Sequence, residues 1–128
     1  MAHNFRNTLA QNCPRAVLFA PSDKVALATK ALGTNADAVC LDLEDGVAKA
    51  QKQNAQAALV GLLDVASQND KPVFVRVNDT SSPEFAADLG VVPPHIPIVL
   101  PKTKGRDDIE LAVRGRQSGV IAMIEDLA

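Results

Sequence analysis

Residues 38–46 read AVCLDLEDG, a stretch that passes from an apolar run into charge within a few positions. A short continuous apolar run is typical of a strand that is buried on both faces, as in a parallel sheet. Carboxylates that follow such a strand at once lie at its carboxyl end, where parallel sheets and barrels build their active sites. The carboxylates of this stretch belong to Asp42, Glu44 and Asp45.

The same alternation continues on both sides of this stretch. Further apolar runs lie at 16–20, 73–77, 98–100 and 120–124. Between the runs, apolar residues at helical spacing predict helices over 25–32, 55–66 and 109–113, with a shorter helical turn at 84–89. Ser22 or Asp23 is expected to cap the first helix, and Gly33 is expected to end it.

The resulting element order, βαβαβ(α)βαβ, predicts a parallel sheet with helices packed outside it. A doubly wound sheet and a β/α barrel both fit that order. No glycine-rich phosphate loop follows any of the apolar runs. The dinucleotide-binding form of a doubly wound sheet is therefore disfavoured.

Composition excludes several classes of protein. With 128 residues, 47% of them apolar and 22% charged, the sequence is typical of one soluble globular domain. A net charge of −2 and four aromatic residues, all Phe, argue against a nucleic-acid partner. No apolar run approaches the about 18 residues of a membrane span. Residues 1–14 are expected to form a polar leader, not a secretory signal.

The two cysteines, Cys13 and Cys40, lie far apart and lack metal-ligand spacing. Cys40 is part of an apolar run and is expected to be a buried small hydrophobic residue. Because no disulfide framework is indicated, a cytosolic location is the default expectation.

Ionisable side chains also follow the later strands. The third run carries Arg76 and is followed by Asn78, while Lys102 follows the fourth run and Glu125 the fifth. Carboxylates are hard oxygen ligands suited to Mg²⁺, and the planar fork of an arginine matches a carboxylate. We therefore expect a polar site at this edge of the sheet.

Other chemistries are disfavoured by what this group of residues lacks. The histidines, His3 and His95, lie in the leader and in a proline-rich loop, where an exposed structural role is expected for His95. Imidazole-based zinc chemistry and a Ser-His-Asp triad are therefore disfavoured. A Schiff-base nucleophile is one role open to Lys102. We favour the alternative, a strand-end lysine that is solvated or paired with an acid.

These strand ends resemble those of a known family. Residues 15–21 (RAVLFAP) are similar to the opening strand of the citrate lyase β-subunit family, which includes the malyl-CoA and citramalyl-CoA lyases. Later signatures follow in the same order, namely 41–45 (LDLED), 76–78 (RVN), 100–102 (LPK) and 123–125 (MIE). The resemblance spans residues 15–128, which would form about the first five strands of an incomplete TIM-type (β/α)8 barrel.

The resemblance implies a Mg²⁺-dependent carbon–carbon lyase. Such an enzyme cleaves a β-hydroxyacyl thioester, carried on CoA or an acyl carrier protein, into an acyl thioester and an α-keto acid. Mg²⁺ would be bound by Glu125 and by an aspartate one βα unit further on. Arg76 would hold the carboxylate of the keto acid, and Glu44 and Asp45 would orient Arg76 or metal-bound water.

The resemblance also implies contacts with the thioester and an assembly. Phe19, Lys24 and Lys30 fall where the thioester lyases contact their substrate, although the family more often has arginine at Lys24. A homo-oligomer is expected from the resemblance alone. Asp126 is a departure, since the family usually has a small hydroxyl residue there, and an extra carboxylate would alter the metal site.

Two rival interpretations remain open. A pyruvate-type class II aldolase has metal ligands at similar strand ends, although 41–45 and 76–78 fit the thioester lyases better. The other is a truncated, catalytically inactive half-barrel, since the second metal aspartate and the last three strands would lie beyond Ala128. An in-frame continuation that encodes an aspartate at a sixth strand end would favour the enzyme.

A half-barrel would leave apolar surface uncovered. The inward faces of the strands would lose the opposite strands, and two sheet edges would be open. We expect the exposed inward residues to be Val17, Val39, Val75, Val99 and Ile121, or their neighbours. The chain is therefore predicted to self-associate or to be molten.

Overall fold

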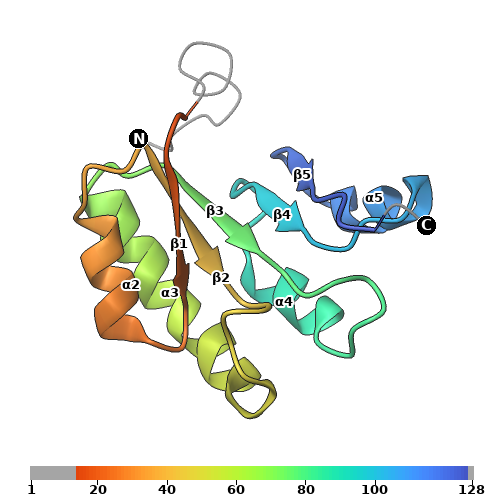
Figure 1. Ribbon diagram of the computed structural model, residues 1–128, viewed down its shortest axis with the longest axis horizontal. Helices are drawn as coiled ribbons and strands as arrows, with labels where there is room; N and C mark the ends of the chain where they lie inside the picture. Colours follow the sequence, from red (N-terminus) through yellow and green to blue (C-terminus); the bar gives the residue numbers. More distant parts are fainter. Residues whose placement is uncertain (1–13, 127–128) are drawn as a thin grey trace.

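The computed structural model describes residues 14–126, and its centre is a parallel sheet (Figure 1). The sheet has five strands in the order β1-β2-β3-β4-β5, and every neighbouring pair is parallel. The strands are β1 (Val17–Pro21), β2 (Ala38–Asp42), β3 (Val73–Arg76), β4 (Ile98–Leu100) and β5 (Val120–Ala122). Their mostly apolar sequences are typical of strands in a parallel sheet that helices cover.

The order of the strands decides between the two architectures that the sequence allows. A doubly wound sheet reverses its winding direction at a switch point, so its spatial strand order differs from the sequence order. Here the two orders are the same. The chain is therefore wound in one direction, as in the wall of a β/α barrel, and the prediction of an incomplete TIM-type barrel with five strands is confirmed.

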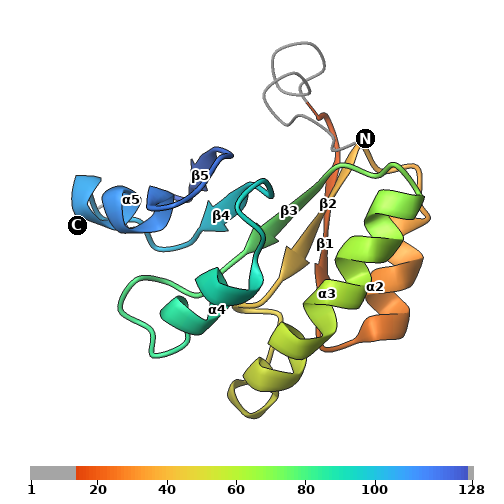
Figure 2. The ribbon, with the colours of Figure 1, turned by 180° about the vertical axis from the view of Figure 1, so that it is seen from behind.

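Helical segments connect successive strands, as Figure 2 shows from the helix-covered side of β1 to β3. Four of them are α-helices and one is a short 3-10 segment. They are α2 (Val25–Leu32), η1 (Lys49–Gln51), α3 (Lys52–Gln68), α4 (Phe85–Val91) and α5 (Arg106–Val113). Each brings the chain back to the start of the next strand, so all carboxyl ends of the strands lie at one edge.

One core joins the helices to one face of the sheet. It combines buried residues of α2 and α3 with alternate residues of the strands, including Val39, Leu41, Val75, Ile98 and Leu100. Leu59 and Leu62 are the largest side chains that α3 contributes, and both are almost completely buried. Burial of a side chain of this size stabilises the fold by about 1.5–3 kcal/mol.

The opposite face of the sheet, which we call the inner face, has a smaller cluster. It consists of Ala38, Cys40, Phe74 and Val99, with Met123 packed beside them. The inward residues were predicted to be Val39 and Val75 or their neighbours, and Val39 and Val75 themselves belong to the helix-side core. Their neighbours Cys40 and Phe74 point inward instead, since successive side chains of a strand alternate between faces.

The edges of the sheet leave apolar side chains in solvent. Val17, Leu18 and Phe19 of β1 are 38%, 41% and 45% exposed, and Ile121 of β5 is 37% exposed. The expectation of uncovered inward residues is therefore confirmed for Val17 and Ile121, whereas Val99 is only 5% exposed. Open strand edges with apolar side chains are templates for pairing with another chain.

The expected cap of α2 is wrong. The N-cap residue is Lys24, which makes no side-chain capping hydrogen bond. The Ser22 N–H donates to the carbonyl oxygen of Asp42 at 3.0 Å, and its hydroxyl is buried and makes no capping hydrogen bond within the described residues. Gly33 ends the helix, as predicted.

Smaller expectations have mixed outcomes. Cys40 is buried, and burial raises the pKa of its thiol to about 12. His95 is exposed, as predicted. Cys13, His3 and most of the expected leader lie outside the described residues. None of the helices within residues 14–126 is long and apolar enough to cross a lipid bilayer.

Exposure of the β1 edge generates a prediction about association. Val17→Lys places a charge on the open inner face and should shift the 128-residue chain from dimers or larger species toward monomer in sedimentation velocity. The control is Val60→Lys on α3, where Val60 is 62% exposed and away from the edge. It should leave the distribution unchanged. A wild-type chain that is a cooperatively unfolding monomer at high concentration would contradict the expected association.

Candidate active site

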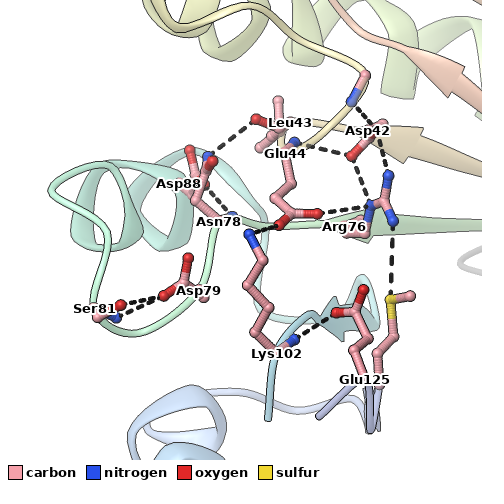
Figure 3. Close-up of polar contacts among 12 residues, drawn as sticks. Asp42, Leu43, Glu44, Arg76, Asn78, Asp79, Ser81, Asp88, Lys102 and Glu125 are labelled. Atoms are coloured by element: carbon pink, nitrogen blue, oxygen red, sulfur yellow. Dashed lines mark hydrogen bonds and ion pairs between the residues drawn. The ribbon is translucent and has the colours of Figure 1, made fainter.

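The carboxyl ends of the strands bring charged side chains of both signs together, as Figure 3 shows. The sheet register pairs Asp42 at the end of β2 with Arg76 at the end of β3. Glu44 follows β2, Lys102 follows β4 and Glu125 follows β5. The structure thus brings these charged side chains together at the expected edge, and their role as a functional site stays a prediction.

Asp42 and Arg76 form a bidentate ion pair. Nε of Arg76 donates to Oδ1 at 2.9 Å, and Nη2 donates to Oδ2 at 2.7 Å. Asp42 also accepts hydrogen bonds from the backbone N–H groups of Glu44 at 2.9 Å and Gly46 at 2.8 Å. Burial raises the pKa of Asp42, but the hydrogen bonds from Arg76 and these two amides outweigh it and leave the pKa below its usual value.

Gly46 is required by this arrangement. A Cβ atom at this position would lie 2.6 Å from Oδ2 of Asp42, which is closer than real Cβ contacts. The carboxylate cannot move away easily because Arg76 holds both of its oxygens. Glycine therefore lets the backbone of the β2 loop approach the carboxylate closely enough to donate its N–H.

The guanidinium of Arg76 is enclosed on several sides. Its Cζ lies 4.9 Å from the centroid of the Phe19 ring, and Nη1 lies 4.0 Å from Sδ of Met123. The hydrogen bonds to Asp42 raise the pKa of Arg76, which stays cationic. Asp42 occupies the Nε–Nη2 side of the fork, so the Nη1–Nη2 end, beside Met123, is the part of the guanidinium that Asp42 does not cover.

Glu44 joins the two cations of the site. Its buried carboxylate lies 3.6 Å from Nε of Arg76 and 3.0 Å from Nζ of Lys102. Lys52, the first residue of α3, holds the same loop by donating to the carbonyl oxygens of Leu43 at 2.9 Å and Glu44 at 2.6 Å. The prediction that Glu44 contacts Arg76 is consistent with this geometry, and the expected pairing of Lys102 with an acid is confirmed.

Lys102 is in an unusual backbone conformation. Its φ is +52°, a region that costs a non-glycine residue roughly 1–2 kcal/mol. In this conformation its N–H donates to Oε2 of Glu125 at 2.7 Å. The hydrogen bond and Coulomb attraction of Glu44 raise the pKa of the Lys102 ammonium.

The residues fit a metal ion in part. Glu125 is exposed, and the Lys102 N–H donates to one of its oxygens, so the carboxylate is oriented and accessible. Within residues 14–126, however, no group of three or more His, Cys, Asp or Glu side chains is arranged to hold a metal. Glu125 therefore fits as one oxygen ligand of a shell that these residues do not complete.

Asn78 has a different role from the rest of the cluster. It is buried, and its Nδ2 donates to the carbonyl oxygen of Leu43 at 3.0 Å and to Oδ2 of Asp88 at 2.6 Å. Asp88 of α4 also accepts from the Asn78 N–H at 2.7 Å and from Gln56 of α3 at 2.8 Å. Burial raises the pKa of Asp88. This network ties the β2 and β3 ends to two helices.

The remaining predicted site residues divide into two that adjoin this cluster and two that lie apart from it. Phe19 is brought under Arg76. Asp45 is exposed and next to Glu44. Lys24 and Lys30 are exposed at the first and last turns of α2, and no contact joins either to the charged cluster within the described part of the chain. Sequence reasoning gave no separate role to Asp42, Gly46 or Asp88, which the structure makes central.

Comparisons with known proteins agree with this architecture. Residues 15–118 match the family model described as HpcH/HpaI aldolase/citrate lyase. The chain belongs to this family. A citrate lyase subunit beta-like protein of Mycobacterium tuberculosis is 39% identical over 111 residues, which is 84% of this chain and 37% of that protein. A (3S)-malyl-CoA thioesterase of Cereibacter sphaeroides is 33% identical over 115 residues, or 88% of this chain and 38% of its own length.

Solved structures of the same family give a similar result. The citrate lyase beta subunit of M. tuberculosis, complexed with oxaloacetate and magnesium, superposes with a TM-score of 0.65 and 31% identity. The match covers 88% of this chain and 49% of that one. A complex of M. tuberculosis protein CitE with magnesium, acetoacetate and coenzyme A has a TM-score of 0.60 at 33% identity, covering 84% and 39%. The chain thus spans under half the length of these relatives.

The close approach at Gly46 can be tested by stability. Gly46→Ala should lower the free energy of unfolding in urea by about 1–3 kcal/mol, because the methyl group would overpack against a carboxylate that Arg76 holds. Gly61→Ala in α3 is the control, since nothing lies within 4 Å of the added Cβ. It should raise the same free energy by about 0.5–1 kcal/mol. Equal effects of the two variants would show that Asp42 is free to move.

Proposed function

We propose that this protein is a Mg²⁺-dependent carbon–carbon lyase that cleaves a β-hydroxyacyl thioester of the citryl, malyl or citramalyl type. The products would be an acyl thioester and an α-keto acid. The observation that supports this proposal is the fixed Arg76 guanidinium, with its Nη1–Nη2 end left for a ligand, beside an oriented Glu125. Family relatives named for malyl-CoA and citrate lyase chemistry support the substrate class.

Arg76 would bind the carboxylate of the keto-acid half. Asp42 holds the guanidinium on one side and Phe19 lies against its ring face, so a carboxylate would meet two N–H groups of fixed direction. Such fixed donors orient the substrate and act without reorganisation as charge moves during bond cleavage. Glu44 and Asp45 would help to orient the Arg76 guanidinium. Glu44 would do so through its ion pair with Arg76, and Asp45 from the neighbouring position in the loop.

Glu125 would be the ligand that this chain contributes to the magnesium ion. When bound, the ion would supply Lewis-acid stabilisation of the substrate hydroxyl oxygen, which becomes the keto oxygen as the carbon–carbon bond breaks. Glu125 is kept in place by the Lys102 N–H. Phe19, Lys24 and Lys30 would contact the thioester, with the two lysines offering charge to phosphate groups of its carrier, and the assembly would be a homo-oligomer in the cytoplasm.

Thioester hydrolysis is a second candidate, because the relatives include a (3S)-malyl-CoA thioesterase at 33% identity. The two reactions give different products from the same substrate. A lyase releases an α-keto acid and leaves the thioester of the shorter acyl group intact. A thioesterase releases free CoA and the unbroken hydroxy acid. The product that accumulates therefore distinguishes the candidates without any assumption about rate.

The reaction can be tested on the protein expressed at its full natural length. Incubation with Mg²⁺ and malyl-CoA or citramalyl-CoA should release an α-keto acid, detected by reduction with a dehydrogenase. Arg76→Lys should reduce kcat/KM by about 100-fold or more, because a lysine can neither make the bidentate pair with Asp42 nor present two parallel donors. Release of free CoA without a keto acid would establish hydrolysis instead. No turnover of either kind would favour the inactive half-barrel.

The metal ligand can be tested separately from turnover. Glu125→Gln removes the charge but keeps the shape, so it should weaken the binding of Mn²⁺, used as a probe for Mg²⁺, by about tenfold or more in electron paramagnetic resonance titrations. Glu110→Gln is a matched control, since Glu110 is exposed on α5 and pairs with Arg106. Unchanged Mn²⁺ affinity in Glu125→Gln would remove Glu125 from the metal site.

A further inference from the structure

Lys102 binds two carboxylates with two different groups. Its ammonium lies 3.0 Å from Oε2 of Glu44, and its backbone N–H donates to Oε2 of Glu125 at 2.7 Å. Glu44 belongs to the loop after β2, and Glu125 follows β5. One residue after β4 therefore connects acids from both sides of the site, as Figure 3 shows.

The conformation of Lys102 indicates that these contacts are built into the fold. A lysine at a φ of +52° is strained, and such strain persists only where the surroundings hold the residue in place. Pro101 before it is fully buried and restricts the backbone. The side chain is 51% exposed, so Lys102 is held here by its contacts with the two acids and not by burial.

The charge around Lys102 is unbalanced. Asp42, Glu44 and Glu125 face two cations, Arg76 and Lys102, and the carboxylates of Asp45 and Asp79 also act on the ammonium. Without Lys102 the buried Glu44 would keep only its longer contact of 3.6 Å with Arg76. The negative charge of Glu44 would then repel any anion that approaches the free end of Arg76.

We propose that Lys102 is a positioning residue that serves as the resident counter-cation of the site, opposing the divalent cation and favouring the keto-acid carboxylate. The inference rests on the proposed function, because it takes Glu125 as the metal ligand and Arg76 as the carboxylate ligand. The Lys102 ammonium neutralises Glu44, which leaves Arg76 free to attract the anion. The Lys102 N–H holds Glu125 in the direction from which it binds the metal.

The ammonium has opposite effects on the two ligands. A positive charge near the site repels a divalent cation and attracts an anion, so its removal should tighten the first and weaken the second. A residue that is only structural behaves differently, since its loss disturbs the site and weakens both ligands or neither. Opposite shifts in the two affinities are therefore the signature that distinguishes a counter-cation from a structural lysine.

The experiment compares three variants of the protein at full natural length. Lys102→Met removes the ammonium but keeps the stem and the backbone N–H. Lys102→Arg keeps the charge, and Lys104→Met removes an exposed lysine two positions away. Mn²⁺ alone is titrated by electron paramagnetic resonance. Pyruvate, the simplest α-keto acid, is then titrated by NMR line broadening at saturating Mg²⁺.

Lys102→Met should bind Mn²⁺ about threefold more tightly or better and pyruvate about threefold more weakly or worse, whereas Lys102→Arg and Lys104→Met should stay close to wild type. Unchanged or weaker Mn²⁺ binding in Lys102→Met would overturn the inference, as would equal shifts in Lys104→Met. The Glu125→Gln titration keeps the two proposals apart. If that variant loses Mn²⁺ while Lys102→Met shows no opposite shifts, the counter-cation role fails and the proposed metal ligand remains.

Discussion

The bidentate pair between Asp42 and Arg76 is the interaction on which the charged cluster depends. It follows from the sheet register, which places the last residues of β2 and β3 beside each other on the inner face. Removal of one member of such a buried pair leaves the other charge unpaired, at a cost of about 3–5 kcal/mol. The carboxylate of Asp42 accepts four hydrogen bonds, two from Arg76 and two from backbone N–H groups of the loop that carries Glu44. The pair thus fixes both the guanidinium and the acidic loop.

This pairing also constrains how the site can recognise an anion. Asp42 already opposes much of the positive charge of Arg76, and Lys102 offsets the charge of Glu44, so these residues alone attract a carboxylate only weakly. A second cation near Glu125 would change that balance. The geometry therefore gives a physical reason why keto-acid binding and magnesium binding belong together, which is the combination named for the M. tuberculosis complex with oxaloacetate and magnesium.

The sequence predicted the location of the site better than its contacts. Charges after continuous apolar runs must lie at the carboxyl edge of a parallel sheet, so the grouping of Glu44, Arg76 and Lys102 was predictable. The partners were not, because they depend on register between distant segments. Asp42 was interpreted only as one of three acids, and Asn78 pairs with Asp88, a residue hidden in a short helix. The choice between Val39 and Val75 and their neighbours was left open for the same reason, since a shift of one residue moves a side chain to the other face of the sheet.

The two faces of the sheet differ in whether the segments that cover them are close in sequence. Each βα unit covers its own strand, so the helix-side core, with Leu59 and Leu62 of α3, is complete within the unit and its neighbours. The inner face has no such local cover, because in a barrel it packs against strands on the opposite side. Phe19 lies at this boundary, 45% exposed yet stacked against Arg76. The described residues that contact Arg76 come from β1, β2, the loop after β2 and the segment after β5, so its orientation is set within this chain. The exclusion of water from its Nη1–Nη2 end, in contrast, depends on what covers the inner face.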